Sequence, residues 1–296
     1  MKEKVFMMVN SPRIQQHLDP SIGKDYRAIN TDDLNYHHRE IILPRDDPKW
    51  NYILKTCYKN MKQRDYRFGD AWATLKYEYT NTELENAVLL RLDISRQGIV
   101  IGSFREYGTI FSEKNACPKC SYGMKQESEL VVRIKKSRKS DILRTVRDEV
   151  WVISDRLANI LEANKVTGYK LMLVRESTPK GPISKRWHQL VVTSNVGLAT
   201  EDTKWGRDPF NLNPPGHFLC KKHNVKEFFI QSELHIKKSN WDGSDFAATT
   251  TLWNVQEHIE DISDAPRPLI VISQRLYQIF RKEKIKGFNV SIVRLR

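Results

Sequence analysis

The sequence predicts an α+β protein in which an N-terminal α+β region precedes two pseudo-repeated strand-helix-strand units, held together by a CxxC/CxxH zinc site. One pattern occurs twice, each copy follows a pair of metal-ligand residues at knuckle spacing, and the first part of the chain has no counterpart in the repeat. These observations divide the chain into an N-terminal region at 1–112, a first knuckle-containing repeat with its linker at 113–186, and a second knuckle-containing repeat at 187–296.

The N-terminal region contains one clear helix signal and three strand signals. Asp47 can accept hydrogen bonds from the free N–H groups of a helix start, and Pro48 suits the first turn. Apolar side chains follow at helical spacing, at Trp50, Ile53, Leu54, Cys57 and Met61. Strand-like runs lie at 87–94, 99–102 and 107–111, separated by turn residues. Cys57, on the apolar face of this helix, is expected to be a core thiol.

The repeated pattern spans 152–175 (VISDRLANILEANKVTGYKLMLVR) and 271–294 (VISQRLYQIFRKEKIKGFNVSIVR). These two segments agree at ten positions without a gap. Shorter echoes keep the same order, with IKKS at 134–137 and 236–239 and Ser-Asp at 140–141 and 244–245. Agreement of this length favours the duplication of one module.

Each copy reads as a strand, a helix and a second strand. Ser154 and Ser273 stand where a hydroxyl can cap the start of a helix. An apolar stripe at spacing i, i+3, i+4 follows, with Leu157, Ile160 and Leu161 in the first copy and Leu276, Ile279 and Phe280 in the second. Gly168 and Gly287 suit a left-handed helix exit, and alternating apolar residues then predict a half-buried strand.

An arginine also recurs in the first turn of each predicted helix, at Arg156 and Arg275. A cation gains nothing from the helix dipole at that position, because the N-terminal end of a helix carries positive partial charge. We therefore expect a carboxylate or backbone partner for both arginines. A shared role in ligand binding is the alternative.

Two short knuckles carry the metal prediction. Cys117 and Cys120 form a CxxC pair, and Cys220 and His223 form a CxxH pair about a hundred residues later. Together they give the Cys₃His set of structural zinc sites, which leaves no coordination position open for water and so argues against metal catalysis. A redox pair, a disulfide or buried thiols remain alternatives for the CxxC pair. His217 is the alternative to His223 as the fourth ligand.

Composition places the chain among globular proteins. It has 296 residues, 40% hydrophobic content and four cysteines, three of them at knuckle spacing, which fits a reducing compartment. The N-terminal segment lacks the apolar run and cleavage site of a secretory signal, and no apolar run is long enough to cross a membrane. The sequence therefore predicts a cytoplasmic location with no membrane contact.

Charge is the main indication of a partner. Lys and Arg number 49 against 36 Asp and Glu, for a formal net charge of +13. Such a field attracts an acidic protein or a nucleic acid, although a generally basic, solvated surface has the same composition. Basic residues cluster at 133–147, 221–226 and 281–286. The first cluster supplies three candidate partner contacts, Lys135, Lys136 and Arg138.

The segment 201–216 (EDTKWGRDPFNLNPPG) is rich in turn residues and runs into the second knuckle. We expect an ordered loop without regular structure, held by the metal. Its Trp205, Arg207 and Phe210 are candidate partner contacts, because long ordered loops are often functional. In the alternative, the two aromatic side chains fill a small core around the metal.

Catalytic motifs are absent from the sequence. It contains no GxxxxGK[ST], GxGxxG, HExxH or GxSxG pattern. The remaining pairs of acidic residues and histidines fit no catalytic spacing. We therefore expect a protein that is not an enzyme.

The two knuckles and the VISxRL…G…VR endings resemble the double-CXXCG proteins and related immunity proteins of bacterial polymorphic-toxin systems, over about 111–296. Ser121 and Asn224 stand where that family has a glycine after each knuckle, and His223 replaces its fourth cysteine. The resemblance implies a cytoplasmic, non-catalytic bacterial or phage protein that neutralises a cognate toxin or another effector by direct binding. A zinc-containing nucleic-acid-binding protein is the alternative function.

Overall fold

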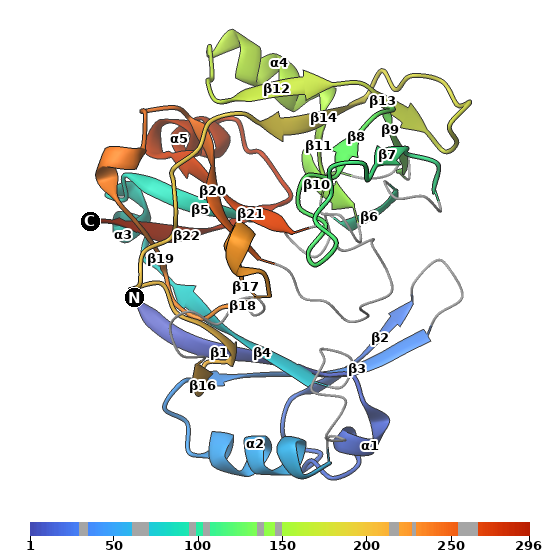
Figure 1. Ribbon diagram of the computed structural model, residues 1–296. Coiled ribbons are helices and arrows are strands. Elements are labelled where there is room, and N and C mark those ends of the chain that lie inside the picture. The colour runs from blue at the N-terminus through green and yellow to red at the C-terminus, as the bar shows by residue number, and fades with distance from the viewer. Residues whose placement is uncertain are drawn as a thin grey trace.

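The computed structural model describes residues 1–29, 35–60, 71–94, 99–102, 107–134, 139–145, 150–212, 219–226, 229–253 and 266–296. Helices and many strands occur together along the chain, so the α+β prediction is confirmed. Figure 1 shows a separate N-terminal layer below a larger body that the rest of the chain forms.

The N-terminal layer is a four-stranded antiparallel sheet in the order β2-β3-β1-β4. Its elements are β1 (Lys2–Val9), α1 (Pro12–Gln15), β2 (Lys24–Ile29), β3 (Asn35–Pro44), α2 (Lys49–Asn60) and β4 (Ala71–Glu78). Both helices lie on the face that points away from the larger body (Figure 1). Val5, Met7 and Val9 of β1 lie on one face of the sheet and pack with Trp50 and Ile53 of α2.

The helix predicted after Asp47 is confirmed. The Asp47 carboxylate accepts a hydrogen bond from the Lys49 N–H at 2.9 Å, and α2 begins at that lysine. Cys57 is buried on the inner face of α2 with an exposed fraction of 1%, as predicted for a core thiol. Burial raises the pKa of this thiol to about 12, so Cys57 is protonated at neutral pH. Met61 lies outside the described residues.

A seven-stranded sheet forms the first half of the larger body, in the order β12-β14-β11-β10-β6-β9-β13. The edge strands β12 and β13 are consecutive in the chain and separated only by Leu173, so the sheet closes on itself. Helix α4 (Asp155–Ala163) leads from β11 towards β12. The strands are β6 (Ile99–Gly102), β9 (Leu130–Arg133), β10 (Ile142–Thr145), β11 (Trp151–Ser154), β12 (Tyr169–Met172), β13 (Val174–Glu176) and β14 (Trp187–Val192). We name this the first closed sheet.

The second half is a six-stranded sheet in the order β17-β20-β21-β5-β22-β19. Backbone bridges from Asn195 to Ala248 and from Ala199 to Ile236 place the segment 195–199 between β20 and β19, which closes this sheet as well. Helix α5 (Gln274–Lys282) leads from β21 towards β22. The strands are β5 (Leu89–Ile94), β17 (Val225–Lys226), β19 (Leu234–Ile236), β20 (Phe246–Trp253), β21 (Arg267–Ser273) and β22 (Phe288–Leu295). We name this the second closed sheet.

The remaining elements are short. They are α3 (Asn81–Glu85), β7 (Phe111–Ser112), β8 (Lys125–Gln126), β15 (Trp205–Asp208), β16 (Asn211–Leu212), β18 (Phe229–Ile230) and the 3-10 helices η3 (Lys221–His223) and η4 (Lys238–Asn240). The segment 201–216 was expected to lack regular structure, and β15 and β16 correct that expectation. Strand β15 pairs with β18 as well as β16, a long-range pairing that turn composition does not reveal.

The described elements also divide the chain differently from a boundary at residue 112. The N-terminal sheet ends at Glu78, and β5 belongs to the second closed sheet, between β21 and β22. A strand-like run in the sequence carries no information about such distant partners, which is why β5 was grouped with the N-terminal region.

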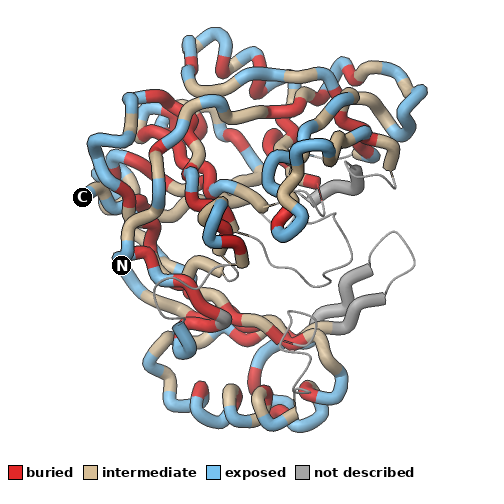
Figure 2. Tube along the Cα trace, in the orientation of Figure 1, coloured by how far each residue is buried: buried red, intermediate tan, exposed pale blue. Residues whose placement is uncertain are grey.

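Three apolar clusters hold the larger body together. One lies inside each closed sheet, and the third lies between the sheets and the helices α4 and α5. Buried positions follow the strands of both sheets, whereas the outer turns are exposed (Figure 2). The cluster between the sheets includes Leu157 and Leu161 of α4 and Leu276 and Phe280 of α5, each with an exposed fraction of 0%. In each predicted stripe two residues are therefore core positions, and the third, Ile160 or Ile279, packs half-buried against the same cluster.

Candidate metal centre

The first knuckle is a turn between β7 and β8. The N–H groups of Cys120 and Ser121 donate to the Cys117 carbonyl at 3.3 and 2.8 Å, and the Cys117 N–H donates to the Tyr122 carbonyl at 2.8 Å. Ser121 has a φ of 56°, in the left-handed region. The tight turn directs both cysteine side chains to one side.

The second knuckle precedes β17. Cys220 and Val225 exchange backbone hydrogen bonds, with N···O distances of 3.4 and 3.1 Å, around the single turn of η3. Asn224, directly after His223, has a φ of 53°. Both residues that replace the glycine of the double-CXXCG pattern, Ser121 and Asn224, thus adopt the left-handed conformation that glycine enters without steric cost. The glycine of that pattern has a direct backbone explanation here.

The two knuckles meet. The ligand atoms of Cys117, Cys120, Cys220 and His223 all lie within 4.8 Å of one another. His223 Nδ1 is 3.3 Å from Cys120 Sγ and 3.6 Å from Cys220 Sγ. Tetrahedral zinc with Zn–S near 2.3 Å and Zn–N near 2.0–2.1 Å requires S···N separations of about 3.5 Å, so the donor set and its spacing fit that ion. His217 lies outside the described residues.

The surroundings of the four ligands are partly apolar. Cys120 and Cys220 have exposed fractions of 0% and 4% and pack with Val225 and Leu252. All four cysteines of the chain are free thiols, so no disulfide joins the first pair. Burial raises the pKa of Cys120 to about 12, whereas the Lys119 N–H lowers the pKa of Cys117 by donating a hydrogen bond to its sulfur. A bound cation would have to displace the Cys120 proton, as thiolate ligation generally requires.

The position of the cluster determines what it can do. Cys117 and Cys120 belong to the β7–β8 hairpin, and Cys220 and His223 lie beside β17, which pairs with β20 of the second closed sheet. A metal held by these four side chains would tie the hairpin to that sheet. Four protein ligands leave no place for a reacting water, so the arrangement suits a structural ion.

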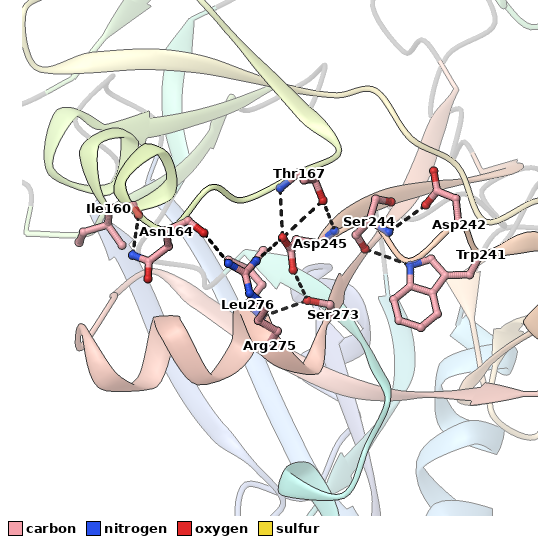
Figure 3. Close-up of polar contacts among 10 residues, drawn as sticks. All are labelled: Ile160, Asn164, Thr167, Trp241, Asp242, Ser244, Asp245, Ser273, Arg275 and Leu276. Atoms are coloured by element: carbon pink, nitrogen blue, oxygen red, sulfur yellow. Dashed lines mark hydrogen bonds and ion pairs between the residues drawn. The ribbon is translucent and has the colours of Figure 1, made fainter.

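A polar network surrounds the start of α5 (Figure 3). The Asp245 carboxylate accepts hydrogen bonds from Ser273 Oγ at 2.7 Å, Arg275 Nη1 at 2.6 Å and the Thr167 N–H at 3.1 Å. Arg275 also donates to the carbonyl of Asn164, at the end of α4. The expected carboxylate and backbone partners of this arginine are both present, and both contacts with 164–167 reach the other half of the body.

The start of α4 carries the equivalent network. The Asp141 carboxylate accepts from Ser154 Oγ at 3.0 Å, from Arg156 Nε and Nη2 at 3.1 and 2.8 Å, and from the Lys286 N–H at 2.9 Å. Arg156 also donates to the Glu283 carbonyl at 3.1 Å, at the end of α5. In each half, the aspartate therefore accepts a backbone hydrogen bond from the segment that follows the helix of the other half.

Further matched contacts involve residues outside the two segments that the sequence predicts to be repeats. Arg175 pairs with Glu129, and Arg294 pairs with Glu233. The two glutamates occupy the same place in the triplet SEL, at 128–130 and 232–234. That short echo was the sequence signal for these ion pairs, and it was missed.

The residues predicted to contact a partner differ in their position and exposure. Trp205 has an exposed fraction of 8% and packs inside the second closed sheet, which removes it from the candidate contact surface. Phe210 is 42% exposed and its ring lies 5.7 Å from that of Trp50 in α2, so neither aromatic residue fills a core around the metal cluster. The backbone of Arg207 lies in β15, and its side chain is outside the described part. Lys135, Lys136 and Arg138 also lie outside the described residues.

Comparison with known proteins adds no family. No protein-family model matches the chain, and no curated protein matches it. None of the helices in the described part of the chain combines the length and apolar composition needed to cross a bilayer.

Proposed function

We propose that the protein is a non-catalytic binding protein in which one structural zinc ion joins two copies of a duplicated module. The observation that carries this proposal is the convergence of four protein ligands, two from each knuckle, within 4.8 Å. Structural zinc is commonly bound by a Cys₃His set, and thiolate and imidazole ligands suit zinc better than they suit hard cations such as Mg²⁺ and Ca²⁺.

Matched contacts support the duplication. Asp141 and Asp245 each bind the serine cap and the first-turn arginine of their own half. Gly168 and Gly287 each pass close to the backbone of the opposite half, where an added Cβ would lie 2.0 Å from the Phe246 oxygen and 2.3 Å from the Ile142 oxygen. A duplicated module whose copies pack through the same residues accounts for both sets of contacts.

The proposed activity is immunity or inhibition: the protein binds a cognate toxin or effector in the cytoplasm and neutralises it. The resemblance to the double-CXXCG and related immunity proteins supports this reading, and the net charge of +13 favours an acidic partner. A metal centre with no open coordination position supports a structural role for the ion, with partner binding by residues on the protein surface.

A toxicity assay tests this proposal. If the gene of this protein adjoins a toxin-like reading frame, co-expression of the two should restore growth, and the purified proteins should form a stoichiometric complex. Failure of the intact protein to bind or neutralise that product would refute the immunity role. A Cys57→Ala variant, altered at a buried cysteine far from the metal ligands, serves as the control and should still protect.

Nucleic-acid binding is the second candidate, favoured by the residues around the metal ligands. Tyr122 is 48% exposed and stacks on the His223 ring at 4.6 Å. Lys119, Lys221 and Lys222 are exposed beside the ligands, and no ion pair joins them to a carboxylate among the described residues. Exposed aromatic rings and lysines together suit bases and phosphates. Affinity for a single-stranded oligonucleotide that falls steeply with salt would favour this function, and salt-independent or absent binding would exclude it.

A further inference from the structure

Two strands occupy matching places in the two closed sheets. Strand β14, which follows β13 along the chain, pairs with β11 and β12 of the first closed sheet. Strand β5, which precedes the other strands of both closed sheets along the chain, pairs with β21 and β22 of the second closed sheet. All four pairings are antiparallel, and each strand has a neighbour on both sides.

The two strands are equivalent residue by residue. Ser154 pairs with Trp187, and its counterpart Ser273 pairs with Leu89. The matched residues Tyr169 and Phe288 pair with Val192 and Ile94, which keeps the same register along both strands. The next backbone contacts agree too, because the N–H groups after the two serines donate to the carbonyls just before the strands, at 2.8 and 3.0 Å.

The order of features along the chain shows to which repeat each strand belongs. After β5 come Thr109, the first knuckle and β9; after β14 come Thr203, the second knuckle and β19. The two threonine hydroxyls accept hydrogen bonds from Val131 and His235, at 2.9 Å in each case. We infer that one repeat runs from β5 to β13 and the other from β14 to β22, and that the two repeats exchange their first strands.

This exchange makes each repeat the binding partner of the other. Leu89 is fully buried among Val271 and Val293 of the second repeat, and Trp187, 5% exposed, is buried among Val152 and Val174 of the first. Withdrawal of either strand would expose apolar interior and leave backbone groups of two neighbouring strands unpaired. The slot accepts an extended strand with a large apolar residue at its start, supplied by the other repeat.

The metal centre is then a second link between halves that are already intertwined. Strand β5 pairs with β22 at six residue pairs and with β21 at four, and these backbone contacts need no metal ion. The inference goes beyond the proposed function, because the exchange holds whatever partner the protein binds.

A cut in the connection between the repeats tests the exchange. A protease site inserted after Lys180, in the exposed turn between β13 and β14, allows the folded full-length protein to be cleaved at one place. The two fragments should elute together in gel filtration, with or without a metal chelator, and separate only in denaturant. Separation of the fragments under native conditions, in either buffer, would overturn the inference.

Hydrogen exchange in the intact chain gives an independent test if the insertion prevents folding. The matched variants are Leu89→Ala and Trp187→Ala. Leu89→Ala should lower amide protection mainly in β21 and β22, and Trp187→Ala mainly in β11 and β13. Loss of protection in the repeat that carries the substitution in its sequence, or an equal loss in both closed sheets, would contradict the exchange.

Discussion

The two halves of the larger body share the aspartate networks at the starts of α4 and α5, but they differ in their contacts with the N-terminal layer. In the second half, the segment between Gly206 and Cys220 is longer than its counterpart between Ser112 and Cys117. The extra residues reach the N-terminal layer, where Asp208 accepts from Tyr58 and the Pro209 carbonyl accepts from Arg45.

A second contact with the N-terminal layer comes from Gln231. Its side chain accepts from the Leu75 N–H and donates to the Ala73 carbonyl, at 3.1 and 2.9 Å, and so binds the backbone of β4. The corresponding residue of the first half, Glu127, is exposed, and the nearby Ile110 is 59% exposed. Residues that match between the two halves therefore build the scaffold, whereas residues that differ between them attach the N-terminal layer to the second half.

Loss of a metal ligand should have the largest effect. Structural zinc sites contribute apparent binding free energies of about 10–16 kcal/mol in small peptides, and that binding is coupled to folding. Cys117→Ser should abolish stoichiometric zinc and destabilise both halves together, whereas Cys57→Ala should keep the metal. Elemental analysis and thermal unfolding measure both effects. Protein prepared without chelator that contains no zinc would contradict the metal assignment.

Removal of an anchoring carboxylate should be the next largest change. Asp141→Asn and Asp245→Asn each replace one acceptor oxygen with an amide group and remove the negative charge of a carboxylate that binds an arginine, a serine cap and a backbone N–H of the other half. The arginines are about half exposed, so we expect a loss of about 1–3 kcal/mol in each case. Chemical denaturation measures it, with Asp93→Asn as a control expected near zero, because the Asp93 side chain is 45% exposed whereas those of Asp141 and Asp245 are buried. Strong destabilisation by only one of the two substitutions would contradict the structural equivalence of the two halves.

The helix exits provide a third test. Gly168→Ala and Gly287→Ala should each destabilise the fold by more than about 1 kcal/mol, because both residues have positive φ and an added Cβ would clash with the opposite half. Gly243→Ala is the control, since Gly243 also has positive φ but nothing lies within 4 Å of its added Cβ. Equal losses at all three positions would mean that backbone strain alone matters and that the close approach of the halves does not.

The knuckle turns should give the smallest change, with opposite sign. Ser121→Gly should stabilise the protein by about 0.5 kcal/mol, because serine pays a steric cost at a φ of 56° that glycine avoids. Asn224→Gly should gain less, since asparagine tolerates the left-handed region better. Thermal unfolding of the zinc-loaded protein compares the two. Destabilisation by Ser121→Gly would show that its side chain makes a contact worth more than the backbone strain.

Local features were accessible from the sequence, and long-range pairings were not. The spacing of Ser154, Leu157 and Leu161 predicted a capped helix with one apolar face, and the two knuckles predicted the ligand cluster. Strand β5 could not be placed, because its alternation indicates a strand but its partners β21 and β22 lie at the far end of the chain. Trp205 was misjudged for the same reason, since its burial depends on strands that its own loop does not contain.

The most direct test of the central claim is a cobalt titration of the metal-free full-length protein. Tetrahedral thiolate ligation gives Co²⁺ an intense visible spectrum that octahedral water ligation lacks. We expect one equivalent per chain, displacement by zinc, and a His223→Cys variant that still binds one equivalent with a spectrum shifted towards four thiolates. Weak binding, a pale octahedral spectrum, or unchanged affinity after Cys220→Ser would contradict a shared metal site between the two halves.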